Sequence, residues 1–209
     1  MLVIETQYFP SIHFFSLIAE FGELCIENHE NYIKQTYRNR CYILGANKIE
    51  RLTVPVLGTE KGEKQLITHT KLDNRTNWQQ IHWRSIRAAY GKSPFFPYYA
   101  DMIENALFTP TETLFELNEN IIKVLLKIIS TATPINTKLS YTNTYQKSYE
   151  LSTENLEKLP IDKRNLTLGV DEISFKPYSQ VFGNQFVSNL SILDLIFCKG
   201  KYLNFDKII

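Results

Sequence analysis

The sequence predicts an α/β protein in which a mixed, partly parallel sheet is flanked by helices. Two observations lead to this class. The chain opens with a strand, a helix and a second strand, and a β-hairpin pattern follows at residues 41–56. Three helical segments and a further strand come next, between residues 78 and 142. Strands and helices that alternate in this way are typical of α/β folds.

The β-α-β opening rests on short apolar runs and helical spacing. Residues 2–4 and 24–27 are β-rich runs, which we interpret as strands. Between them, residues 13–21 carry apolar side chains at helical spacing, and Gly22 ends that pattern. Two strands joined by a helix of this length are expected to pair in parallel.

The next strands are predicted from turn chemistry. Residues 41–44 and 49–56 are β-rich and flank the turn sequence Gly-Ala-Asn-Lys, which indicates a hairpin. Residues 66–70 are a further candidate strand, and residues 138–142 are expected to form a late one.

Three helices are predicted from N-cap patterns, in which Ser or Thr precedes Gln, Glu or Pro at the spacing that starts a helix. The three pairs are Thr76 with Gln79, Ser93 with Pro94, and Thr113 with Glu116. They predict helices at about 78–90, 94–107 and 114–128. A short, largely apolar helix is expected at 191–197.

Length and charge limit the class of protein. The 209 residues are expected to form one domain, 1–209, with residues 148–170 as an irregular or lid segment. Lys and Arg number 23 against 22 Asp and Glu, which argues against a nucleic-acid or anionic-membrane partner. No signal peptide is visible, and no apolar run reaches the about 20 residues of a membrane span. We therefore expect a cytoplasmic protein.

Cysteine and histidine spacing predicts no metal site. The three cysteines, Cys25, Cys41 and Cys198, form no C-x-x-C pair, so we interpret them as reduced, buried thiols. The four histidines show no short paired spacing. Phosphate-binding glycine motifs and the nucleophile-elbow motif are also absent from the sequence.

The densest group of chemically capable residues follows the second strand, where α/β sheets place ligands. Lys34, Arg38 and Arg40 are expected to bind an anion, because Arg presents a planar fork of donors. If the segment is helical, Lys34 and Arg38 share a face. His29 or Glu27 would be the general base. The further expected binding residues here are Tyr32, Gln35 and Asn39. The alternative is a solvated helix whose acidic side chains pair with its own cations.

Two other segments supply candidates. In the first turn these are Gln7, Tyr8 and His13, because N–H groups at a helix start can receive an anion. In the helix at 78–90, Gln80 and Arg84 are expected to complete the pocket. Two alternatives stay open in this helix: Arg84 pairs with Asp101 or Glu104, and His82 is either a core histidine or a catalyst.

Several motifs, in order along the chain, are similar to the WbqC-like protein family of bacteria. They are QYFP at 7–10, YIKQTYRNR at 32–40, LTVPV at 52–56, AYGKSPFF at 89–96 and NLSILD at 189–194. Longer members carry an Asn-Pro-x-Gly-Gly-like segment, and nothing like it occurs here between Thr142 and Val170.

The resemblance implies group transfer in O-antigen or lipopolysaccharide biosynthesis, with an amino acid such as glycine, or an acyl group, moved onto a sugar. The expected partner is an anionic small molecule, and a nucleotide or nucleotide sugar is a candidate cofactor. Two alternatives are a non-catalytic protein-binding scaffold and an adenylating ligase of nucleotidylyltransferase type. The ligase version predicts magnesium-dependent ATP binding at His13.

Overall fold

The computed structural model describes residues 2–21, 23–58, 63–133, 138–145, 175–203 and 205. The predicted irregular or lid segment at 148–170 lies outside these residues. The α/β class is confirmed. The strands are β1 (Leu2–Glu5), β2 (Glu23–Glu27), β3 (Arg40–Leu44), β4 (Ile49–Thr53) and β5 (Lys138–Tyr141). The helices are α1 (Ile12–Phe21), α2 (Trp78–Tyr90), α3 (Phe96–Phe108), α4 (Leu114–Ala132) and α5 (Ile192–Lys199).

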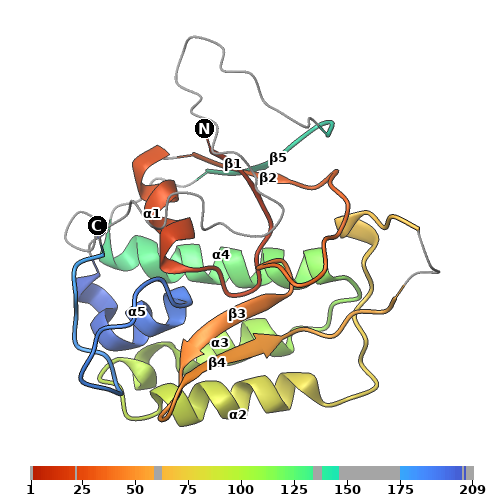
Figure 1. Cartoon of the computed structure of the whole chain (residues 1–209). Coiled ribbons are helices and arrows are strands. Elements are labelled where there is room, and N and C mark those ends of the chain that lie inside the picture. The colour runs from red at the N-terminus through yellow and green to blue at the C-terminus, as the bar shows by residue number, and fades with distance from the viewer. Residues whose placement is uncertain are drawn as a thin grey trace.

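The parallel and antiparallel strands form two separate sheets (Figure 1). One sheet has the order β1-β2-β5, and both of its pairings are parallel. The register places Glu5 of β1 beside Glu27 of β2, at the carboxyl ends of these two strands. The second sheet is the antiparallel β3–β4 hairpin that the turn sequence predicts. Carboxyl groups therefore meet at the sheet edge where ligands bind in α/β folds.

Helix α4 packs between the parallel sheet and helix α3. Its residues Phe115, Glu119 and Ile122 face Ile26 of β2 and Leu139 of β5. It also packs against α3, which in turn contacts α2. In Figure 1 α4 runs beneath the parallel sheet, with α3 and the hairpin on its other side. The long apolar stripe of α4 is thus buried from both directions.

Helix α5 closes the side of the core where the chain ends. It contacts α1, α3 and β3. Ser191 caps it, accepting a hydrogen bond from the Leu193 amide. Gly200 follows with a φ of 49°, and a Cβ there would lie 2.3 Å from the Phe95 ring. Glycine, which has no Cβ, can adopt this backbone conformation and leave room for the Phe95 ring.

The segment at 28–39, for which a helix was one possibility, is irregular, so Lys34 and Arg38 share no helix face. Its main chain bonds to distant segments instead: Tyr32 N–H donates to Gln65 O, and Ile67 N–H donates to Glu30 O. The candidate strand at 66–70 is a 3₁₀ turn, Ile67–His69.

Two of the three predicted helix starts are wrong. Asn77, without a side-chain cap, precedes α2 where a Thr76 capping box was expected. Ser93 does not cap α3, because its hydroxyl donates to Tyr90 O at the end of α2. Helix α3 begins after Phe95, with Pro97 in its first turn. The Thr113–Glu116 capping box of α4 is present in full.

These caps give a matched stability test. Thr113→Ala removes the acceptor of the Glu116 amide and should lower the free energy of unfolding by about 1 kcal/mol. For a chain of this size that is a fall of about 2–4 °C in Tm. Thr76→Ala is the control, because Thr76 is exposed and caps nothing. Equal Tm values for the two variants would contradict the capping assignment.

Candidate functional site

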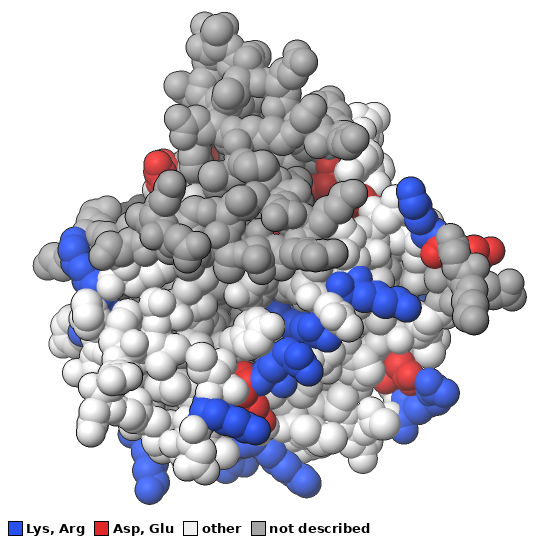
Figure 2. All heavy atoms as spheres, viewed as in Figure 1, with Lys and Arg blue, Asp and Glu red and all other residues white. Residues whose placement is uncertain are grey.

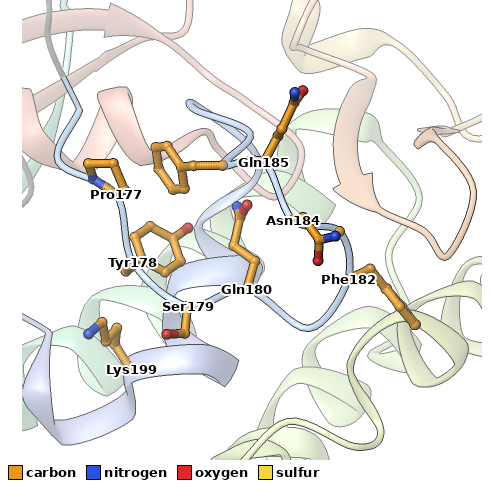
Figure 3. A pocket seen from close by; sticks show the side chains of 10 residues that line it. Pro177, Tyr178, Ser179, Gln180, Phe182, Asn184, Gln185 and Lys199 are labelled. Atoms are coloured by element: carbon orange, nitrogen blue, oxygen red, sulfur yellow. The ribbon is translucent and has the colours of Figure 1, made fainter.

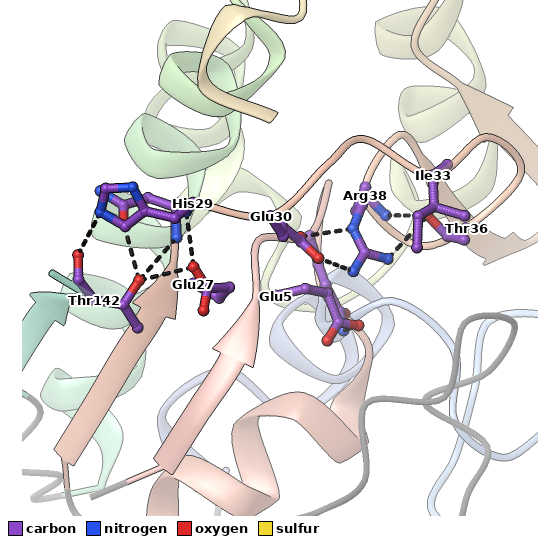
Figure 4. Close-up of polar contacts among 10 residues, drawn as sticks. Glu5, Glu27, His29, Glu30, Ile33, Thr36, Arg38 and Thr142 are labelled. Atoms are coloured by element: carbon purple, nitrogen blue, oxygen red, sulfur yellow. Dashed lines mark hydrogen bonds and ion pairs between the residues drawn. The ribbon is translucent and has the colours of Figure 1, made fainter. Parts of the chain in front are cut away.

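Three carboxyl groups are buried at the carboxyl ends of β1 and β2 (Figure 4). Glu5, Glu27 and Glu30 are each no more than 6% exposed. Gln7 Nε2 donates to Glu5 Oε1 at 3.2 Å. Thr142, just after β5, places its hydroxyl 2.8 Å from Glu27 Oε1. The adjacent ends of three parallel strands therefore contribute to one polar cluster.

Arg38 is the cation of this cluster. Its guanidinium binds Glu30 through two hydrogen bonds, Nε to Oε1 at 2.7 Å and a short Nη2–Oε2 contact. The Arg38 side chain is buried, and its main-chain carbonyl accepts from Asn118 Nδ2 of α4 at 2.8 Å. Arg38 is therefore enclosed in the protein, away from the solvent-facing position expected for an anion clamp.

Burial controls the protonation of the cluster. Desolvation raises the pKa of Glu30 to about 7, although Arg38 opposes this, and the nearby Glu5 and Glu27 raise it further. Desolvation also raises the pKa of Glu5, with the Arg38 charge again opposing. Three acids beside one arginine therefore favour uptake of a proton into this region.

His29 lies beside the cluster with a defined tautomer. Its Nε2 is 3.0 Å from the Thr142 carbonyl oxygen, which can only accept, so Nε2 carries the proton. In the neutral imidazole, Nδ1 is then the nitrogen that can accept a proton. Glu27 Oε1 accepts from the His29 main-chain N–H at 2.7 Å, which fixes the start of the loop. His29 is half-buried, so its ring is partly open to solvent.

An open pocket of about 350 Å³ lies between this loop and the segment that follows β4. We call it the basic pocket. Its lining mixes polar and apolar surface and includes three cations, Lys34, Arg40 and Lys64, and one acid, Glu63. The other lining residues are Tyr32, Gln35, Asn39, Val56, Leu57, Gly58 and Gln65. Five of the residues expected to bind substrate therefore share one cavity.

The walls of the basic pocket are held by the main chain. Asn39 Nδ2 donates to Val54 O at 3.1 Å, and the Val54 amide returns a bond to Asn39 O. Gln35 has a φ of 65°, a left-handed conformation that is uncommon for its residue type. Arg40 Nε is buried without a hydrogen-bond partner among the described residues.

The remaining predicted residues lie elsewhere. Gln7 and Tyr8 are fully buried, and the Tyr8 hydroxyl contacts His82 Nδ1 at 2.8 Å. Burial lowers the pKa of His82 to about 4, so this histidine is a neutral core residue. Gln80 and Arg84 are exposed on α2 and do not line the basic pocket.

The start of α1 gives no support to anion binding. The Ile12 amide donates to Leu190 O, and the His13 amide donates to Asn189 Oδ1. The Phe14 amide donates a hydrogen bond to Ser11 Oγ. His13 itself is 2% exposed, and burial lowers its pKa. The donors that a nucleotide phosphate would need there are already used within the protein.

Sequence reasoning missed part of this arrangement. Glu5 lies near Arg38, Asn118 donates to its main-chain carbonyl, and Lys64 adds a third cation to the basic pocket. The acid at the end of the first strand was a usable signal for Glu5, because the same residue type ends the second strand. Nothing local marks Lys64 or Asn118, which reach the site from distant parts of the chain.

Neither a metal site nor a membrane span emerges from the described segments. They hold no group of three or more His, Cys, Asp or Glu side chains placed to bind a metal ion. None of their helices combines the length and apolar character needed to cross a membrane. All three cysteines are buried and free, as expected.

The motif resemblance is supported by comparison with known proteins. The WbqC-like protein family matches residues 6–163, about three-quarters of the chain, including the basic pocket. This chain belongs to the WbqC-like protein family. The uncharacterized protein Rv1507c of Mycobacterium tuberculosis (strain ATCC 25618 / H37Rv) is 28% identical over 225 residues, covering 95% of this chain and 93% of that protein. No solved structure matches the chain.

The raised pKa of Glu30 predicts a pH dependence of stability. Its ordinary value is 4.5 and its folded value about 7, so the folded state binds the proton more tightly. This contribution is fully present below pH 4.5 and is lost as pH rises through 7. As pH rises from 4.5 through 7, the unfolding free energy of wild type should therefore fall relative to that of Glu30→Gln.

Urea unfolding from pH 4 to 8 measures that difference. Glu20→Gln, which replaces an exposed carboxyl group, is the control and should follow wild type throughout. A difference that rises with pH would show that Arg38 keeps Glu30 ionised and would contradict the burial argument.

Proposed function

We propose that this WbqC-like protein is a small-molecule group transferase that binds an anionic substrate in the basic pocket. The observation that carries the proposal is the convergence of Lys34, Arg40 and Lys64 on one open cavity between the loop that follows β2 and the segment that follows β4. In Figure 2 Lys and Arg side chains gather over the β3–β4 hairpin and the neighbouring surface. The chain as a whole is nearly neutral, so this is a local concentration of charge.

The proposed anion site differs in one cation from the site that the sequence predicts. Arg38 is occupied by Glu30, and Lys64 takes its place as the third cation. Three cations against one acid suit a ligand with more than one negative charge, such as a phosphate, a diphosphate or an activated carboxylate. Tyr32 and Gln35 supply neutral donors and acceptors beside them.

The proposed chemistry uses His29 as the general base and Glu27 as the residue that positions it. His29 Nδ1 would take the proton of an incoming amine or hydroxyl as that group attacks the activated carbonyl carbon. The bond to the phosphate leaving group then breaks, and the leaving oxygen departs with the electron pair and its charge. The cations of the basic pocket would stabilise that charge. His29 precedes Tyr32, a pocket residue, by three positions.

We place this reaction in bacterial surface-polysaccharide synthesis, with an amino acid or acyl group moved onto a sugar. The rival is a non-catalytic scaffold. The modest volume and the three cations of the basic pocket favour a small anion over a docked protein, which would need a broad apolar surface. A cytoplasmic location stays a prediction.

A binding panel tests the proposal. Thermal unfolding would be followed with inorganic phosphate, pyrophosphate, ATP with magnesium, and nucleotide sugars. A ligand at about 100 times its Kd stabilises by roughly 2.7 kcal/mol, a Tm rise of several degrees. Lys34→Ala/Arg40→Ala should weaken binding on the order of 100-fold, because two charge-assisted hydrogen bonds are lost.

The matched control removes the same charge elsewhere. Arg87→Ala/Lys92→Ala replaces two exposed cations at and beyond the end of α2 and should bind as wild type. Equal weakening by both double variants would show only a general effect of net charge. A panel without any shift would favour the scaffold. Binding that is lost only in His13→Ala would favour the adenylating ligase.

A further inference from the structure

A second pocket lies in a part of the chain that the family match does not reach. Its volume is about 700 Å³, and residues 177–186 form most of its wall, with Lys199 of α5 at one side (Figure 3). The match to the family ends at residue 163, whereas the 28% identity with Rv1507c extends over 95% of this chain. We call it the amide pocket.

The back of the amide pocket is fixed by a buried carboxyl group. Asp194, in the first turn of α5, is fully buried. Its Oδ2 accepts from the Tyr178 hydroxyl at 2.5 Å and from Gln180 Nε2 at 2.9 Å. Gln180 also exchanges two hydrogen bonds with the main chain of Val187, both 2.9 Å. These hydrogen bonds hold the side chains of Tyr178 and Gln180 in one orientation.

The front of the pocket presents unused polar groups. Ser179 and Asn184 are exposed, and the side chain of neither one hydrogen-bonds to any described residue. Each of them can both donate and accept a hydrogen bond. Lys199 adds a donor, and no Asp or Glu is present in the lining. In Figure 3 the Asn184 side chain lies between Gln180 and Phe182.

Aromatic rings provide the apolar part of the surface. Tyr178 and Phe186 meet edge to face with ring centres 5.1 Å apart, and Phe182 also lines the pocket. All three are half-buried, so parts of their rings remain open to a ligand. Ring faces attract C–H groups, while amides and hydroxyls pair with groups that both donate and accept.

We propose that the amide pocket binds a neutral, hydroxyl-rich ligand of saccharide size. Such a ligand offers hydroxyl groups to Ser179 and Asn184 and C–H faces to the rings. An anion would meet one cation, Lys199, and a purely apolar ligand would leave the polar side chains desolvated without partners. The inference does not depend on the basic pocket or on transferase activity.

Saturation-transfer difference NMR with defined sugars tests this. The probes are glucose, maltose, N-acetylglucosamine and its β1-4 dimer, each at about 20 mM, since single sugar sites bind in the millimolar range. At least one probe should receive saturation from the wild-type protein. In Ser179→Ala/Asn184→Ala the signal should fall about 5-fold or more, because each lost hydrogen bond is worth about that factor. The single variant Asn184→Ala tests the same prediction with a smaller change to the protein.

The controls separate this pocket from the rest of the molecule. Asn105→Ala/Ser130→Ala makes the same two replacements at exposed positions of α3 and α4 and should keep the signal. Lys34→Ala/Arg40→Ala should also keep it, whatever that variant does to anion binding. No signal from any of the four sugars, an equal signal in Ser179→Ala/Asn184→Ala, or displacement of the sugar by inorganic phosphate would each overturn the proposal.

Discussion

The ion pair between Arg38 and Glu30 is the interaction on which the rest of the site depends. Both side chains are buried, so replacing Glu30 by an apolar residue would leave the Arg38 charge without its partner, a loss of about 3–5 kcal/mol. The pair joins the two ends of the loop at 28–39. Hydrogen bonds from Asn118 to Arg38 O and from Ile67 to Glu30 O then attach those ends to α4 and to the segment after β4. An irregular loop without helical bonds thereby acquires a fixed shape.

That fixed shape separates two roles within one short segment. Residues that point inward, Glu30 and Arg38, hold the loop, whereas Lys34 and Arg40 reach the basic pocket. Arg38 is held inside the protein by Glu30, so the cations left to face a ligand are those that line the basic pocket. The proposed anion site is therefore a consequence of the buried pair beneath it. His29, at the start of the same loop, is oriented by Glu27 and Thr142 from two neighbouring strand ends.

Local sequence patterns predict most of the helices and strands, whereas contacts between distant segments determine the structure of the loop at 28–39. The β-α-β opening, the hairpin and the Thr113 cap follow from apolar spacing and turn chemistry, and all are present. The loop at 28–39 forms no helix, because main-chain groups of Glu30, Tyr32 and Tyr37 bond to distant segments. The sequence grouped Lys34, Arg40 and Tyr32 in one expected site, and the three residues line one pocket. It left open whether Arg38 binds an anion or pairs with an acid of its own segment, and the ion pair with Glu30 shows the second.

The most direct test of the basic pocket is a backbone amide NMR titration of the whole chain with inorganic pyrophosphate. The account predicts chemical-shift changes concentrated at residues 32–40, 56–58 and 63–65, saturating with a single Kd, while α1 and the exposed face of α2 stay unchanged. Changes centred on the start of α1, or changes spread evenly over all surface lysines and arginines, would contradict it.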